Sequence, residues 1–443
     1  MNSIYEEAVN AIPFKARRGR LEADGSGNLH MDGVDLPELA RQYGTPLFVF
    51  SERSLRANYR DMRRIFSRYF EKLEICFACK SNSLLAVLRT LREEGAWADV
   101  VSGGEYYKAL KAGVPGERIV FNGNNKKREE LKQAIENGSL INVDSIAELY
   151  MVHEAAGDLG TKAKISIRVN GDISPDIIAE FATAQKGSKF GVDLDGEAFS
   201  AYRYASQSPH MEVLGIHSHI GSQIEDSRYY RHAGERIMDF VGVLKKELGI
   251  ELTYVNMGGG FGIPFDYLTQ PDGLEAFASS IHSIIQSKVK EYGLKTPVLM
   301  IEPGASLAGT CAVTLMKVGT VKQREGKKLA ALDGGGDTLL RATQGWYTYR
   351  ALCANKMDQP EEEICDLVGP LCYEGDVLAR GRRMCVLKEN DILAFLDTGA
   401  YTTSLMNNYN GRPTAAAVMI TESGDVKLIK RRQSLEDLIS GEE

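Results

Sequence analysis

Two side chains that could take part in catalysis, a lysine and a glutamate, lie at the ends of short apolar runs of the chain. Lys80 ends the run LEICFACK, and Glu302 follows VLMI in the stretch VLMIEPG. Burial disfavours a charged amine, so we expect the pKa of a lysine at such a strand end to fall. A neutral lysine amine is the nucleophile that forms Schiff bases. The alternative for Lys80 taken alone is an ammonium group that reaches solvent.

Two further strand ends carry groups suited to binding a phosphate. Gly258, Gly259 and Gly260 follow LTYVN, and glycines present bare backbone N–H groups to an anion. Residue 263 is isoleucine, so the run does not fit the dinucleotide motif GxGxxG. Ser222, in HSHIGSQ, offers a hydroxyl to the same phosphate. The alternative for the glycines is a tight turn.

The same HSH segment contains two imidazoles. His217 and His219 share one face of a strand, which is compatible with a metal pair or with a ring stacked in a pocket. No third His, Cys or acid lies nearby in sequence, so we predict no metal site.

Eight strand-and-helix units position these residues. The apolar runs are followed by helical patterns with apolar residues three and four positions apart, most of which end in glycine. The predicted strands are residues 73–80, 97–102, 118–123, 140–145, 163–170, 213–221, 252–259 and 298–304. This count predicts a (β/α)8 barrel, whose functional residues lie at the carboxyl ends of the strands.

The pattern changes after residue 304, where strands follow one another without matching helices. We therefore predict an α/β barrel plus an all-β domain of sandwich or barrel type. The predicted parts are an N-terminal segment, 1–46, that packs with the β domain, a barrel over 47–304 and the β domain over 305–443. The strand LFVFSE (47–52) precedes the first barrel helix and is not needed among the eight.

Composition narrows the functional class. A net charge of −7 does not favour a nucleic-acid partner. No apolar run approaches the roughly 18–20 residues that cross a bilayer, and the N-terminus lacks the pattern of a secretory signal, so we expect no membrane partner. Seven scattered cysteines favour reduced thiols and a cytoplasmic location.

A Schiff-base lysine, a phosphate-binding glycine run, an imidazole and a buried acid together describe a site for pyridoxal 5′-phosphate (PLP). A carboxylate against the pyridine nitrogen keeps it protonated, which makes the ring a strong electron sink.

The chain also resembles a known family, the fold-type III PLP-dependent decarboxylases that act on diaminopimelate, ornithine, lysine and arginine. The resemblance runs from about residue 30 to 430, and the barrel motifs look most like diaminopimelate decarboxylase. The two ends are also similar to D-ornithine/D-lysine decarboxylase. The motifs that carry it are FACKSN, DVVSGGE, INVDS, HSHIGSQ, GGGFG, IEPG, VGPLC, GDVL and GAYT.

The resemblance implies a role for each matching residue. Lys80 binds PLP as a Schiff base, His219 stacks on the ring, and Glu302 pairs with the pyridine nitrogen. Ser222, Gly259, Gly260 and Tyr401 hold the phosphate. Asp99 and Glu105 are implied to be acids that support the residues in direct contact with the cofactor. Residues implied to contact substrate are Arg341, Tyr373, Glu374 and Tyr401.

Cys372, in VGPLC, matches a cysteine that family members lend across a homodimer interface. The implied mechanism is loss of the substrate α-carboxylate as CO2, followed by protonation of the quinonoid at Cα by Cys372. The active site is then shared between two subunits.

Three substrate-side positions depart from the diaminopimelate decarboxylase pattern. Position 305 is Ala where the family has Arg, the acid after Cys372 is displaced by one to Glu374, and an expected tyrosine is Gly345. Loss of an arginine that binds a carboxylate or phosphate is not conservative. The substrate is therefore diaminopimelate, another basic amino acid, a D-amino acid or a larger conjugated diamino acid.

Two other functions remain as alternatives. A fold-type III racemase places Arg on the pyridine nitrogen, and Glu302 argues against that class. A regulatory homologue without PLP chemistry is the non-enzyme alternative, and the presence of Lys80, His219 and Cys372 argues against it.

Overall fold

The computed structural model describes residues 21–263 and 272–443. These residues form two compact units. The first holds residues 58–263 and 272–306, and the second holds residues 21–57 and 307–443. Among the helices of the described residues, none combines the length and apolar composition needed to cross a membrane.

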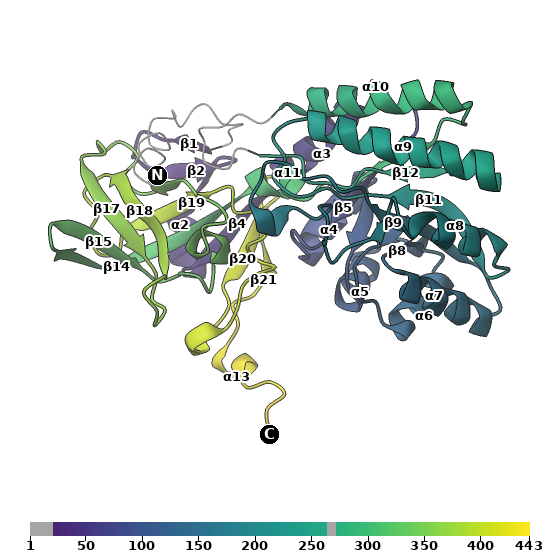
Figure 1. The fold of residues 1–443 in the computed structure, drawn as a ribbon. Coiled ribbons are helices and arrows are strands. Elements are labelled where there is room, and N and C mark those ends of the chain that lie inside the picture. The colour runs from purple at the N-terminus through teal and green to yellow at the C-terminus, as the bar shows by residue number, and fades with distance from the viewer. Residues whose placement is uncertain (1–20, 264–271) are drawn as a thin grey trace. The chain divides into compact units, whose positions relative to one another are not determined.

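The first unit is a closed barrel of eight parallel strands (Figure 1). β13 pairs with β5 and β8 pairs with β9, which closes the ring, while a short ninth strand, β10 (Val192–Asp193), extends from β9. The barrel strands are β5 (Leu73–Ala78), β6 (Trp97–Val100), β7 (Ile119–Phe121), β8 (Leu140–Val143), β9 (Ala163–Asn170), β11 (Met211–His217), β12 (Tyr254–Asn256) and β13 (Val298–Ile301). The predicted barrel is confirmed.

Most predicted strands extend further than the observed ones at their carboxyl ends. Lys80, for example, lies two residues beyond β5, because the chain turns there and Ser81 N donates to Ala78 O at 3.0 Å. His219 and Glu302 likewise follow β11 and β13. The chemical groups therefore belong to the loops at the barrel mouth, where backbone geometry is freer than in a strand.

Helices separate the barrel strands along the chain, and serine caps begin two of them. Ser102 accepts a hydrogen bond from Glu105 N, and Ser145 accepts one from Glu148 N, which places both glutamates in first turns. The barrel helices are α3 (Glu52–Phe66), α4 (Leu85–Glu93), α5 (Gly103–Lys111), α6 (Arg128–Glu136), α7 (Ile146–Asp158), α8 (Ala198–Gln207), α9 (Arg228–Leu248) and α10 (Leu274–Tyr292).

The second unit is rich in β-sheet, as predicted. Its main sheet has the order β18-β17-β15-β14-β4-β20-β21, with β16 and β19 paired alongside. The strands are β4 (Leu47–Ser51), β14 (Ala312–Arg324), β15 (Lys327–Leu332), β16 (Ala351–Cys353), β17 (Glu363–Val368), β18 (Val377–Met384), β19 (Ile392–Leu396), β20 (Ala416–Ile420) and β21 (Val426–Lys430). β4, the segment LFVFSE, lies in this sheet and outside the barrel.

Residues from before the barrel share a core with this sheet. Leu29, in β2 (Leu29–Met31), and Leu36, at the start of α2 (Leu36–Tyr43), are buried with Val313 and Val418. Residues 1–20 of the predicted N-terminal segment lie outside the described residues. The predicted boundaries at 46/47 and 304/305 stay predictions.

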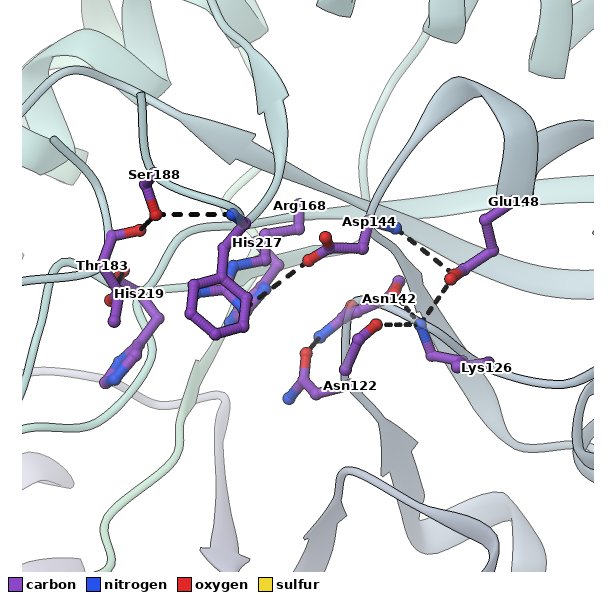
Figure 2. Close-up of polar contacts among 12 residues, drawn as sticks. Asn122, Lys126, Asn142, Asp144, Glu148, Arg168, Thr183, Ser188, His217 and His219 are labelled. Carbon is purple, nitrogen blue, oxygen red and sulfur yellow. Dashed lines mark hydrogen bonds and ion pairs between the residues drawn. The ribbon is translucent and has the colours of Figure 1, made fainter. Parts of the chain in front are cut away.

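A buried ion pair fastens the loops after β7 and β8. Lys126 Nζ lies 2.6 Å from Glu148 Oε1 and also donates to the carbonyls of Gly123 and Asn142, each at 2.8 Å (Figure 2). Both side chains are buried, which raises the pKa of Glu148 and lowers that of Lys126. The pair joins the backbone at the ends of the neighbouring strands β7 and β8.

Removal of the buried cation tests this role. Lys126→Met leaves the Glu148 charge buried without its partner, so we expect a loss of about 3–5 kcal/mol in the free energy of unfolding measured with urea. Lys132→Met, which removes a partly exposed lysine 2.9 Å from Asp158, is the matched control and should change the midpoint little. Equal losses in the two variants would contradict the assignment.

Candidate active site

Lys80 lies beside an acid that is fully buried. Its Nζ is 3.1 Å from Asp99 Oδ2, and Asp99 lies in β6 next to Ala78 of β5. Burial raises the pKa of Asp99, Lys80 lowers it, and Glu302 raises it again, with a net rise. A carboxylate in this position is a fixed counter-charge for a cationic nitrogen on Lys80.

Glu302 is buried at the end of β13 and accepts three hydrogen bonds. Asn122 Nδ2 and Asn256 Nδ2 each donate to Oε1 at 2.8 Å, and His217 Nε2 lies 3.2 Å from Oε2. Burial alone would raise the pKa of this carboxyl. His217, Lys80 and Asn122 more than offset burial and hold the pKa well below its ordinary value. Glu302 is therefore a carboxylate.

Glu105 is a second acid near Lys80. Its Oε2 accepts from Val101 N at 3.0 Å, one residue before Ser102, which caps α5. Burial raises the pKa of Glu105 to about 7, the bond from Val101 lowers it, and Asp99 raises it.

His219 is held in a fixed orientation. Gly259 N donates to His219 Nδ1 at 3.2 Å, so Nδ1 is an acceptor, and a neutral ring carries its proton on Nε2. The Thr183 hydroxyl donates to His219 O at 2.7 Å, tying the loop after β9 to this residue (Figure 2). Burial, Lys80 and Arg168 lower the pKa of His219 well below its ordinary value. The ring is neutral and suited to stacking.

The glycine run makes a cradle that no larger residue fits. A Cβ on Gly259 would lie 1.9 Å from Glu302 O, and one on Gly260, where φ is 93°, would lie 1.9 Å from Gly221 O. Backbone therefore packs directly on backbone, next to the half-buried Ser222. Gly258 N donates to Asn256 Oδ1 at 2.9 Å and Gly259 N donates to His219 Nδ1, so the Gly260 N–H and the Ser222 hydroxyl are the groups of this loop best placed for a phosphate. The lysine, imidazole and ionised acid suit a pyridine aldehyde, so the donor set fits PLP.

The remaining predicted site residues lie in the second unit. Arg341 is buried, with its guanidinium carbon 4.8 Å from the centre of the Tyr347 ring and 5.2 Å from that of Tyr401. Cys372, Tyr373 and Glu374 are exposed in the turn between β17 and β18. The contacts with the Tyr347 and Tyr401 rings restrict the orientation of the Arg341 guanidinium group, and a guanidinium group in a fixed orientation is suited to binding a carboxylate.

Sequence reasoning assigned no role at Glu302 to three residues that contact it. Asn122 and Asn256 have no predicted function, and His217 is predicted only as one of a metal pair or as a stacked ring. Their position at the carboxyl ends of predicted barrel strands could have assigned them to the site, because inward-facing polar side chains at these ends converge.

The chain is similar to known proteins over nearly its whole length. Residues 52–309 match the family described as "Pyridoxal-dependent decarboxylase, pyridoxal binding domain". The chain is 38% identical over 423 residues to diaminopimelate decarboxylase of Methanothermobacter thermautotrophicus, covering 95% of this chain and 97% of the relative. It is 34% identical to the Bacillus subtilis enzyme of that name, covering 93% and 94%.

Solved structures are similar to the chain as well. One of them is the crystal structure of diaminopimelate decarboxylase from Methanocaldococcus jannaschii in complex with L-lysine. It has a TM-score of 0.90 and 36% sequence identity, and the match covers 96% of this chain and 97% of that one.

The match covers more than half of the chain in the family comparison and nearly all of it in the others. The chain therefore belongs to the pyridoxal-dependent decarboxylase family and is a PLP-dependent amino-acid decarboxylase.

Proposed function

We propose that the protein removes the α-carboxylate of a diamino acid of the diaminopimelate class. The observation that carries the proposal is Glu302, a buried carboxylate with three donors at the barrel mouth. An anionic partner keeps the pyridine nitrogen of PLP protonated. That form of the ring best accepts the electron pair left at Cα, which is what a decarboxylase requires.

Each residue around the cofactor has a proposed task. Lys80 binds its aldehyde carbon, and Asp99 supplies the counter-charge beside that nitrogen. Glu302 holds the ring nitrogen and His219 covers the ring face. The proposed phosphate ligands are Ser222, Gly259, Gly260 and Tyr401. Once bound, PLP supplies the electron sink that makes loss of CO2 feasible.

The substrate-side residues are proposed from the second unit. Arg341, held by the Tyr347 and Tyr401 rings, is suited to a substrate carboxylate. We propose Tyr373 and Glu374 as further substrate contacts. A second candidate substrate, a larger conjugated diamino acid, is favoured by Ala305 and by Gly345, where an added Cβ would meet no atom within 4 Å.

We further propose that Cys372 returns a proton to Cα and that it does so in the site of the partner subunit. Its thiol is exposed, as a group lent across a homodimer interface must be before assembly. All seven cysteines are free thiols, which supports a reducing, cytoplasmic location.

A CO2-release assay tests the function. Purified protein with PLP is offered meso-diaminopimelate, L- and D-lysine, L- and D-ornithine, arginine and acylated diamino acids. We expect release from meso-diaminopimelate and its loss in Lys80→Ala, which lacks the amine that binds the cofactor. Turnover by Lys80→Ala would refute the assigned lysine. Turnover of a conjugated diamino acid alone would establish the second candidate.

Mixed dimers test the shared site. Lys80→Ala and Cys372→Ala are each expected to be nearly inactive as homodimers. When they are mixed and allowed to exchange subunits, half of the dimers pair an intact Lys80 with an intact Cys372 from the other chain. We expect recovery of about one quarter of wild-type activity, by counting sites in a two-fold dimer. No recovery after proven exchange would place Cys372 in its own subunit's site.

Glu105 predicts a pH dependence of stability. Burial raises its pKa from 4.5 to about 7, so the stability it contributes is full below about pH 4.5 and is lost as the pH rises through 7. Glu105→Gln cannot ionise. From about pH 5 to about pH 8, we expect the free energy of unfolding of the cofactor-free wild type to fall by about 1–2 kcal/mol relative to this variant. Parallel urea-unfolding curves at both pH values would contradict the shift.

A further inference from the structure

One amide group lies between the two buried acids of the site. Asn122 Nδ2 donates to Asp99 Oδ1 at 2.7 Å and to Glu302 Oε1 at 2.8 Å. A side-chain NH2 has two hydrogens, so both are used. Asn122 is 3% exposed, Asp99 0% and Glu302 3%, so all three groups are shielded from solvent.

A second amide fixes the orientation of the first. Asn142 Nδ2 donates to Asn122 Oδ1 at 2.7 Å, and the backbone carbonyl of Asn142 accepts from the buried Lys126 (Figure 2). If the Asn122 amide turned over, its oxygen would face two carboxylates and its NH2 group would face another donor. The network therefore allows one orientation only.

The bridge matters because two buried carboxylates repel each other strongly. Without the bridging donor, one of them is expected to take up a proton to relieve the repulsion. Asn122 acts against this at both acids, since its bonds lower the pKa of Asp99 and of Glu302. Asp99 is the more vulnerable of the two, because its pKa is already raised.

We propose that Asn122 is a positioning residue that keeps both carboxylates charged and in place, Asp99 beside Lys80 and Glu302 among its amide and imidazole donors. It thereby links the two ends of the cofactor site. The inference rests on the proposed roles of Lys80 and Glu302. Among the described residues, the other charged or titratable groups that act on Asp99, Lys80 or Glu302 include Cys76, Cys79, Glu105, Arg168, His217 and His219.

The chain offers a matched control in Asn256. Its Nδ2 donates to the same Glu302 Oε1, also at 2.8 Å, and the residue is 1% exposed. Among the described residues, the structure gives Asn256 no bond to Asp99. Asn256 Oδ1 also accepts from Gly258 N at 2.9 Å, so removal of Asn256 weakens the support of Glu302 and of the glycine run but takes no hydrogen bond from Asp99.

The experiment compares Asn122→Leu, Asn256→Leu and wild-type holoenzyme. The visible absorbance of the protein–PLP complex is titrated with pH, and the Kd of PLP is measured separately by fluorescence quenching. In Asn122→Leu, a protonated Asp99 no longer stabilises a cationic nitrogen on Lys80, so we expect the absorbance midpoint to move down by about one pH unit. In Asn256→Leu we expect weaker PLP binding but a midpoint within about 0.3 unit of wild type.

Two outcomes would overturn the proposal, namely an unmoved midpoint in Asn122→Leu and equal shifts in both variants. If urea unfolding shows that Asn122→Leu does not fold, Asn122→Ser replaces it. A hydroxyl donates one hydrogen and serves one acid, so the shift should be smaller and of the same sign. A wild-type absorbance that does not titrate, or that survives in Lys80→Ala, would instead refute the proposed function.

Discussion

The site depends on keeping a carboxylate charged inside a protein. Glu302 is 3% exposed, and an ionised carboxylate at that depth is costly unless donors surround it. In the barrel, two amides and an imidazole from three different strand ends stabilise the ionised form of Glu302 by hydrogen bonds. An apolar neighbour in place of any one of them would favour the neutral acid, and a neutral acid cannot keep the ring nitrogen of a pyridine protonated.

Closure of the barrel makes this arrangement possible. Asp99, Asn122 and Glu302 are far apart in sequence, yet the β13–β5–β6–β7 order brings their strand ends together. The backbone of Gly259 also packs on the backbone of Glu302, so the glycine run that we propose for the phosphate lies directly against the acid. The Lys126–Glu148 pair then supports Asn142, which in turn orients Asn122.

Much of this was predictable from the sequence because barrel enzymes follow a positional rule. Eight apolar runs predicted eight strands, and the residues at or near their carboxyl ends included Lys80, His219 and Glu302. The links to Asn122, Asn256 and His217 were not predictable, because they depend on which strands become neighbours and on which way an amide points. The sequence shows which residues can donate hydrogen bonds, but it does not show which acceptor each donor reaches in the fold. Substrate choice was not predictable either, since Ala305 and Gly345 remove side chains and leave no positive signal of what replaces them.

The most direct test of the central claim is the ionisation state of Glu302 in the holoenzyme. Protein labelled with 13C at the glutamate carboxyl carbons, with the Glu302 signal assigned by Glu302→Gln, would be followed by NMR as the pH changes. A signal at the position of an ionised carboxylate that does not move between about pH 9 and about pH 5 is the predicted result. A signal that titrates within that range, or that lies at the position of a neutral acid throughout, would contradict the account.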